Sequence, residues 1–303
     1  MHENQVYNLR GIVPPLATPL HDQDTLDQAG LRKLLKHVID GGVQGIFMLG
    51  TTGEAPSLSY HLRKEVIEVS VAEVSRSVPV LVGISDSSLS EAIAFARFAA
   101  QAGASAVVVA PPFYYPATQQ ALYDYVIQIC AAVDIPLYIY NIPSHSPHAF
   151  SPETIVRLLE HPQVAGYKDS TCSMMAYHQL KYKLGADFKK TYLLGPEELL
   201  AESVMLGAHG GVNGGANIFP KLYVRLYEAA VKGDTALMNE LHQKVMQVSQ
   251  NLYQGGKTVI QGVKFALAEK GICQEQVALP LVSLSAEEKE NMRSFLHSFD
   301  AEL

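Results

Sequence analysis

The chain has few cysteines, and none of them stands in a recognisable pattern. Its 303 residues include only Cys130, Cys172 and Cys273, an odd number of widely separated positions. No disulfide framework is therefore expected, and no cysteine–histidine spacing resembles a zinc site. We interpret Cys172 as a small buried residue first and as a reactive thiol second.

The sequence also lacks basic clusters and long apolar segments. The formal net charge is -7, so nucleic acids and anionic membranes are not expected partners. Met1–Gln5 is polar, and the apolar segment Gly11–Ala17 is short and contains two prolines. Neither a signal peptide nor a membrane-spanning helix is predicted. With 48% hydrophobic and 17% charged residues, the composition is that of a globular protein, and we expect a cytoplasmic enzyme.

Short apolar runs alternate with amphipathic segments along most of the chain. Several helices carry signals at their first residues: Ser88–Glu91 forms a capping box, and Ser151 precedes a proline at the first helical position. Eight runs read as strands: Gly11–Ala17, Gly45–Leu49, Val78–Val82, Ala106–Ala110, Ile135–Tyr140, Val164–Lys168, Thr191–Leu194 and Gly210–Val212.

Eight strand–helix repeats predict parallel strands closed into a (β/α)8 TIM barrel. An open doubly wound sheet is the alternative, but no G-x-G-x-x-G follows the first strand. From about Phe219 only helical patterns remain. We therefore predict a barrel over residues 1–218 and, over residues 219–303, a C-terminal helical extension packed on it. Its helices are expected at Tyr223–Val231, Thr235–Leu252, Val259–Lys270 and Ala286–Phe299.

The stretch Val164–Thr171 ends a buried strand with a lysine. Lysine is rarely buried without a partner, and the simplest explanation for Lys168 is an ion pair with Asp169. Neighbours on a strand point to opposite faces, however, so an inward Lys168 would leave Tyr167 and Asp169 on the other side. The alternative is that Lys168 is an amine nucleophile for carbonyl chemistry.

Polar and aromatic residues follow other strands, where the catalytic groups of parallel barrels lie. Gly50–Glu54 can hold a carboxylate through Thr51 and Thr52, although an ordinary turn is the alternative. Pro111–Pro116 is an aromatic loop, which could equally be a hydrophobic cap or a subunit contact. Tyr140 ends the strand before that of Lys168. Adjacent strands lie about 4.8 Å apart, so the phenol and the amine could meet, unless Tyr140 is simply a core tyrosine.

Three segments together resemble the dihydrodipicolinate synthase / N-acetylneuraminate lyase family: Gly50-Thr-Thr-Gly-Glu54, Tyr140-Asn-Ile-Pro-Ser144 and Gly166-Tyr-Lys-Asp-Ser170. The resemblance covers nearly the whole chain. It implies a (β/α)8 barrel with C-terminal helices, usually a homotetramer built as a dimer of dimers. It also implies class I aldolase chemistry, in which a lysine forms a Schiff base with a 2-oxo acid.

The resemblance assigns roles to individual residues. Lys168 would be the Schiff-base lysine, and Tyr140 the phenol that shuttles protons. Thr51 would relay protons to Tyr140, and Thr51 with Thr52 would bind the carboxylate of the 2-oxo acid. Tyr114 matches a tyrosine that reaches into the neighbouring subunit's site. Burial would lower the pKa of Lys168 and favour the neutral amine, and neither a metal nor an organic cofactor is needed.

The identity of the substrate depends on residues that differ between branches of the family. Synthases commonly carry an arginine where this chain has His145, and a neutral imidazole is a poor substitute for it. In the lyase branch an acidic pair binds sugar hydroxyls, which Glu197 and Glu198 after Gly195 fit in part; charge at a helix N-terminus is the alternative. In the loop Gly210–Asn217, Gly214 stands where lyases have a serine, and two other loop residues are expected to contact substrate: Val212 and Asn213.

Thr191–Pro220 contains no lysine or arginine, which disfavours a phosphorylated substrate. The sequence thus predicts cleavage of a hydroxylated 2-keto-3-deoxy or sialic-type acid to pyruvate and an aldehyde. Dihydrodipicolinate synthase activity, which condenses pyruvate with aspartate semialdehyde, is the first alternative. A barrel that binds 2-oxo acids without catalysis is the second, and the presence of all four expected catalytic residues argues against it.

Overall fold

The computed structural model describes residues 6–253 and 259–299. Eight parallel strands form one curled sheet in the order β1-β8-β7-β6-β5-β4-β3-β2. The strands are β1 (Gly11–Ile12), β2 (Ile46–Met48), β3 (Val80–Gly83), β4 (Ala106–Val109), β5 (Leu137–Asn141), β6 (Val164–Asp169), β7 (Thr191–Leu194) and β8 (Gly210–Gly211). Pro15 pairs with Phe47 and closes the ring between β1 and β2, which confirms the predicted (β/α)8 barrel.

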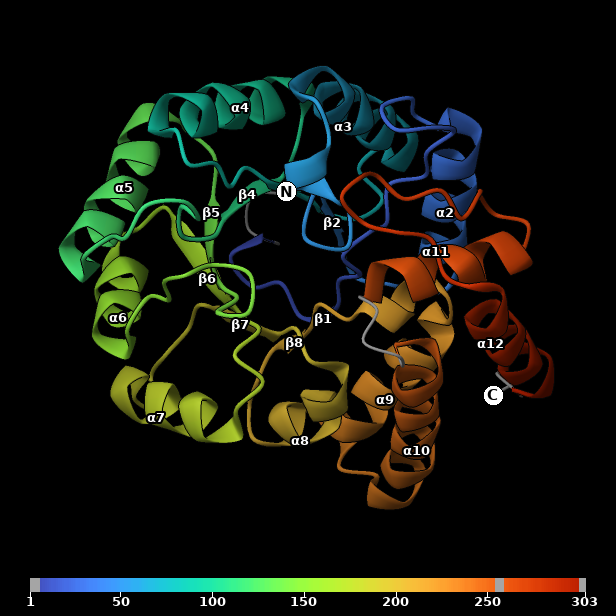
Figure 1. The fold of residues 1–303 in the computed structure, drawn as a ribbon. Helices are drawn as coiled ribbons and strands as arrows, with labels where there is room; N and C mark the ends of the chain where they lie inside the picture. The colour runs from blue at the N-terminus through green and yellow to red at the C-terminus, as the bar shows by residue number, and fades with distance from the viewer. Residues whose placement is uncertain (1–5, 254–258, 300–303) are drawn as a thin grey trace.

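A ring of helices surrounds the strands (Figure 1). These helices are α2 (Gln28–Asp40), α3 (Tyr60–Val74), α4 (Leu89–Ala102), α5 (Gln119–Ala132), α6 (Pro152–Glu160), α7 (Met174–Leu184), α8 (Leu200–Met205) and α9 (Pro220–Lys232). The serines expected to cap helices do so: Ser88 and Ser151 accept from the backbone N–H groups of Glu91 and Thr154.

The first strand is shorter than the predicted Gly11–Ala17. Pro14 and Pro15 have no N–H group, so they cannot donate to a neighbouring strand. The chain nevertheless stays beside β2 through single bonds: the N–H of Phe47 donates to the Pro14 carbonyl, and the N–H of Leu16 donates to the Phe47 carbonyl. Prolines also delay the starts of β3 and β5. These strands begin just after Pro79 and Pro136, later than the predicted starts at Val78 and Ile135.

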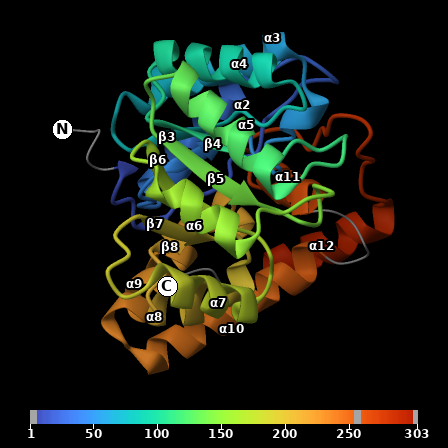
Figure 2. The same cartoon turned by 90° about the vertical axis from the view of Figure 1, so that its left-hand side faces the viewer.

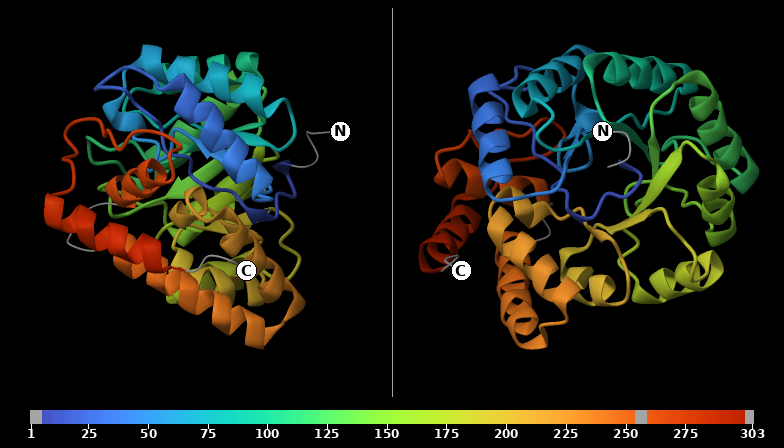
Figure 3. Two further views of the ribbon diagram at one scale, coloured as in Figure 1. Left: turned by 90° about the vertical axis from the view of Figure 1, so that its right-hand side faces the viewer. Right: turned by 180° about the vertical axis from the view of Figure 1, so that it is seen from behind.

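The helical extension begins later than residue 219. Helix α9 packs against α8 and β1 and takes the place of the eighth barrel helix, so the extension starts after Gly233. It comprises α10 (Thr235–Leu252), α11 (Val259–Glu269) and α12 (Ala286–Ser298). These helices lie on one side of the barrel (Figure 3). Figure 2 shows α11 at the end toward which the strands point, opposite the N-terminal segment.

Buried apolar side chains form one layer on each face of the sheet. The larger lies between strands and helices, and the smaller fills the barrel interior. Tyr167 belongs to the outer layer, whereas Tyr138 and Tyr140 belong to the inner one, as strand alternation requires. At the bottom of the barrel the Tyr138 hydroxyl donates to the Val6 carbonyl. The lower half of the interior is thus plugged, and the open end lies above Tyr140.

No helix among the described residues combines the length and the apolar character that a membrane span requires.

Candidate active site

Lys168 lies inside the barrel near the end of β6. Lys168 pairs with Tyr140 of β5 and is only 5% exposed. The Nζ atom lies 3.4 Å from the centroid of the Tyr140 ring and 5.3 Å from that of Phe47. Two neighbouring strands in register therefore bring the amine and the phenol ring together.

Asp169 faces the other side of the strand and has other partners. Its Oδ2 accepts from the Tyr192 hydroxyl at 2.6 Å, and its Oδ1 accepts from the N–H of Thr171 at 2.8 Å. Burial lowers the pKa of Lys168, while Tyr140 and Asp169 oppose the shift. The geometry therefore agrees with an amine that is neutral more often than an exposed lysine, as nucleophilic attack requires.

Tyr140 is buried beneath the open end of the barrel, and one further hydroxyl approaches it. The Ser170 hydroxyl lies 3.5 Å from the Tyr140 hydroxyl, at the limit of a hydrogen bond. Ser170 was not singled out by the sequence, although it belongs to the Gly166–Ser170 segment. It lies just beyond the end of β6, where the chain turns across the barrel.

The loop Gly50–Glu54 holds Thr51 and Thr52 in a constrained turn. The N–H of Glu54 donates to the Thr51 carbonyl at 3.0 Å, and the Thr18 hydroxyl donates to the Gly53 carbonyl at 2.8 Å. Glu54 has the left-handed φ of 57°, which costs a non-glycine residue roughly 1 kcal/mol. Contacts outside the loop must therefore stabilise this conformation.

A cavity of about 400 Å³ opens above Lys168. Thr51, Thr52 and Tyr140 line it beside Lys168, as do His145, Ser170 and Cys172. Tyr253, Val259 and Ile260 of the helical extension complete its wall. No sequence signal pointed to these three residues, because they lie about 90 positions beyond Lys168 in the chain and approach it only in the folded barrel.

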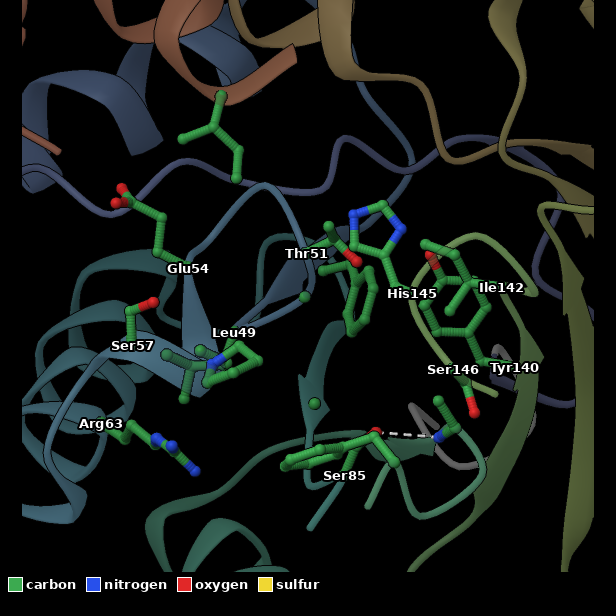
Figure 4. Close-up of a pocket in the computed structure, with 18 of the residues that line it drawn as sticks. Leu49, Thr51, Glu54, Ser57, Arg63, Ser85, Tyr140, Ile142, His145 and Ser146 are labelled. Atoms are coloured by element: carbon green, nitrogen blue, oxygen red, sulfur yellow. Dashed lines mark hydrogen bonds between the residues drawn. The ribbon is translucent and has the colours of Figure 1, made fainter. Parts of the chain in front are cut away.

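A second hollow, of about 230 Å³, adjoins this cavity. Both are lined by Thr51, Tyr140 and His145, so these side chains form the boundary between them. Figure 4 shows the second hollow, with Arg63 and Tyr140 on opposite sides of it. Burial, followed by the charge of Lys168, lowers the pKa of His145, which keeps its imidazole neutral at physiological pH.

The two glutamates after Gly195 are placed differently from each other. Glu197 is buried and accepts hydrogen bonds from the Tyr223 hydroxyl, from the Tyr253 hydroxyl at 3.2 Å and from the N–H of Gly215 at 3.0 Å. Its acceptor sites are thus occupied from within the protein. Glu198 accepts from the Ser249 hydroxyl, and both glutamates line the cavity.

The loop after β8 contributes less to the cavity than its polar residues suggested. Val212 and Gly214 line the cavity. Asn213 is fully buried, and its amide donates to the Gly195 carbonyl at 3.0 Å, so it joins the two loops. A β-carbon on Gly214 would lie 2.8 Å from a methyl carbon of Val259. The extension therefore explains why a serine is not accommodated there without movement.

Burial raises the pKa of Glu197 to about 7, which predicts a pH-dependent stability. Between about pH 4.5 and 7 the folded chain binds a proton that the unfolded chain has released, so stability falls as the pH rises. The free energy of unfolding falls by about 3 kcal/mol by pH 8.

Urea unfolding at pH 5 and pH 8 should show this slope of the free energy of unfolding with pH in the wild type and not in Glu197→Gln. The same substitution at exposed Glu240 should leave the slope intact; a wild-type slope in Glu197→Gln would contradict the assignment.

Tyr114 does not reach the cavity of its own chain. Its side chain is 74% exposed on the loop after β4 and packs edge-on against Tyr115. An exposed aromatic pair of this kind is available to a neighbouring molecule.

Within the described part of the chain, no group of three or more histidine, cysteine, aspartate or glutamate side chains is arranged to hold a metal ion.

Comparison with known proteins places the chain in a family. The model of the dihydrodipicolinate synthetase family matches residues 8–299. The chain belongs to this family. A 4-hydroxy-tetrahydrodipicolinate synthase from Bradyrhizobium diazoefficiens is 35% identical over 285 residues, covering 94% of this chain and 95% of the relative. An uncharacterised DapA-like lyase from Halobacterium salinarum is also 35% identical, covering 95% of this chain and 93% of the relative.

Solved structures of the family have the same fold. The dihydrodipicolinate synthase of Bacteroides thetaiotaomicron is 44% identical with a TM-score of 0.92, covering 96% of this chain and 99% of that one. A prophage family member from E. coli K12, solved in complex with pyruvate, is 28% identical with a TM-score of 0.91, covering 95% and 98%. The predicted family and the prediction of a Schiff-base lyase or synthase are thereby confirmed.

Proposed function

We propose that this protein binds pyruvate as a Schiff base on Lys168 and forms or breaks a carbon–carbon bond between pyruvate and an aldehyde. The observation that carries the proposal is the position of Lys168, buried at the open end of the barrel with its Nζ 3.4 Å from the Tyr140 ring centroid. Pyruvate is supported as the first substrate by two relatives solved in complex with it, from E. coli K12 and Acinetobacter baumannii.

The residues around the cavity suit each step of this reaction. The neutral amine of Lys168 attacks C2 of pyruvate, and water leaves as the imine forms. Thr51 and Thr52 bind the pyruvate carboxylate. A proton passes from C3 to water and gives an enamine, which attacks the aldehyde carbon. Tyr140 gives a proton to the new alkoxide and regains one from water, and hydrolysis of the product imine frees Lys168. In the cleavage direction Tyr140 takes that proton back as the C3–C4 bond breaks.

Condensation with aspartate semialdehyde is the first candidate for the complete reaction. It is supported by the names of two relatives that are 34–35% identical over more than 90% of the chain. The sequence analysis gives this reaction as its first alternative. Glu197 lines the cavity but already accepts hydrogen bonds from Tyr223 and Gly215, which leaves fewer free acceptor sites for the sugar hydroxyls of the cleavage reaction.

Cleavage of a hydroxylated 2-keto-3-deoxy or sialic-type acid is the second candidate. It is favoured by the chemistry of the cavity, which among its described lining residues contains no arginine and has a neutral His145. A second substrate carboxylate would there lack a guanidinium partner. Glu198, which lines the cavity, could accept hydrogen bonds from substrate hydroxyls.

The proposal is tested by borohydride reduction with pyruvate, followed by intact mass and peptide mapping. A pyruvate adduct on Lys168 is expected. Pyruvate with aspartate semialdehyde should then give a condensation product, whereas 2-keto-3-deoxy sugar acids or sialic acid should release pyruvate if the second candidate holds. Absence of the adduct in folded protein would overturn the proposal. An adduct without turnover on either panel would favour a binding protein.

Residue 145 should control whether a second carboxylate is accepted. Replacing His145 with arginine supplies a bidentate partner, so we expect kcat/KM for aspartate semialdehyde to rise by about 10-fold or more. A short aldehyde without a carboxylate should gain nothing, and His148→Arg, on the same loop outside the cavity, serves as the matched control. An unchanged ratio of the kcat/KM values for the two aldehydes would mean that this position does not contact the substrate.

We also propose that the active enzyme is a homotetramer built as a dimer of dimers. Tyr114, which is exposed in the single chain, would reach the neighbouring active site and extend the Thr51–Tyr140 proton relay. Sedimentation of the wild type and of Tyr114→Ala measures the assembly directly.

A further inference from the structure

Glu54 and Lys264 form a buried ion pair between the barrel and the helical extension. Glu54 ends the Gly50–Glu54 loop after β2, and Lys264 lies in α11. Their side chains are both 0% exposed, and Lys264 Nζ contacts Glu54 Oε1. Removing two charges from water is expensive, and a buried pair is often no more stable than apolar residues of the same volume. Stability alone is therefore a poor explanation for this pair.

Each partner has a second hydrogen bond that fixes its position. Glu54 Oε2 accepts from the N–H of Ala278 at 2.7 Å, and Lys264 Nζ donates to the Gln276 carbonyl at 2.6 Å. The carboxylate is thus held between α11 and the segment that follows it. Burial lowers the pKa of Lys264, and the charge of Glu54 opposes that shift, so the ammonium of Lys264 depends on its partner.

The backbone of Glu54 connects this anchor to the active site. Glu54 has a left-handed φ of 57°, and its N–H closes a turn onto the Thr51 carbonyl at 3.0 Å. Leu49, at the other end of the loop, has a similar φ of 55°. Two strained residues thus bracket Thr51 and Thr52, and Figure 4 shows the Glu54 carboxylate pointing away from Thr51. The side chain of Glu54 holds the turn from outside while Thr51 faces the cavity.

We propose that Glu54 and Lys264 are positioning residues, through which the helical extension holds Thr51 and Thr52 where they bind the pyruvate carboxylate and approach Tyr140. The roles of the two threonines rest on the proposed function. The extension also supplies part of the cavity wall, so it contributes to the wall and also holds the Gly50–Glu54 loop. Neither residue lines the cavity above Lys168, and Glu54 borders only the second hollow.

Steady-state kinetics on four variants tests the proposal. Lys264→Met leaves a buried carboxylate unpaired, and we expect kcat/KM for pyruvate to fall by about 10²-fold, mainly through KM, because the loop is displaced. Glu54→Gln keeps an acceptor for the Ala278 N–H and should lose less. Combining Glu54→Gln with Lys264→Met removes both charges and should come within about threefold of Glu54→Gln alone, since the two sites are coupled.

The matched control is Lys289→Met, which breaks the Lys289–Glu275 pair within the extension without contacting the loop. It should leave the kinetic constants unchanged. Hydrogen exchange of the peptide spanning residues 49–58 supplies a readout independent of activity: exchange should accelerate in Lys264→Met and not in Lys289→Met. If Lys264→Met does not fold, Glu54→Gln is measured in its place by the same two readouts.

The outcomes separate this proposal from the proposed function. Absence of a pyruvate adduct on wild-type Lys168 would overturn the proposed function, whereas the exchange data would still show whether the pair holds the loop. Lower thermal stability with unchanged pyruvate KM and unchanged exchange at residues 49–58 would mean that the pair is purely structural and would overturn the positioning role.

Discussion

Replacing Lys168 with methionine is expected to abolish the pyruvate adduct and to lower turnover by a factor on the order of 10⁴–10⁶, as for removal of other catalytic nucleophiles. Methionine retains the length of the side chain and its contact with the Tyr140 ring but has no amine. Borohydride trapping with mass mapping and a product assay measure the two effects. Lys36→Met, at an exposed position on α2, is the control and should behave as the wild type.

The same variant should be at least as stable as the wild type. Burial lowers the pKa of Lys168, so between this lowered pKa and the ordinary one the unfolded chain binds more protons at this residue than the folded chain does. The wild type therefore gains stability as the pH rises toward the ordinary pKa of lysine, and Lys168→Met should lack this gain. Thermal unfolding at several pH values tests the sign of this pH dependence.

The trapping experiment on Lys168→Met has its own decisive outcome. A pyruvate adduct that persists in the variant would assign the Schiff base to another lysine.

Replacing Tyr140 with phenylalanine should separate Schiff-base formation from carbon–carbon chemistry. The variant keeps the ring that covers the Lys168 amine at 3.4 Å, so trapping with pyruvate should still label Lys168. It lacks the hydroxyl that moves the proton at the new alcohol, and general acid–base catalysis of this kind contributes about 10²–10⁴-fold. Turnover should fall by a factor in that range.

Tyr138→Phe is a closely matched control for this experiment. Tyr138 lies two residues earlier on β5 and points into the same interior, but its hydroxyl donates to the Val6 carbonyl at the closed end of the barrel. Its loss should lower stability and leave turnover per folded molecule unchanged. Equal losses of turnover in the two variants would mean that the Tyr140 hydroxyl has no special role in proton transfer.

The proton transfer proposed for Tyr140 depends on how the barrel alternates side chains between its two faces. Lys168 faces the cavity, whereas Tyr167 and Asp169 are turned toward the helices. The carboxylate of Asp169 is bonded there by Tyr192 and by the backbone of Thr171. A shift of one residue in the β5–β6 register would replace Lys168 by a neighbour of the opposite face. The pairing of Tyr140 with Lys168 is thus a requirement for the chemistry.

The positions of Lys168, Tyr140, Thr51 and Thr52 could be anticipated from the sequence, because each follows or ends an apolar run. Parallel strands bring their carboxyl ends to one rim, so local patterns suffice to collect these residues there. The same patterns gave the eight strands and most helices. They erred at the edges, where prolines shorten β1, and at α9, whose amphipathic pattern does not distinguish a barrel helix from an extension helix.

Contacts between residues distant in the chain were decided only by the tertiary structure. Nothing local joins Glu54 to Lys264, or predicts that Glu197, which lines the cavity, would be bonded by Tyr223 and Tyr253. The sequence alone therefore determined the fold and the family, since these follow from short-range periodicity and motif order, and it indicated Lys168 as the amine expected to react. The shape and polarity of the substrate cavity depend on the extension that packs over it, and long-range packing is not encoded in any local pattern.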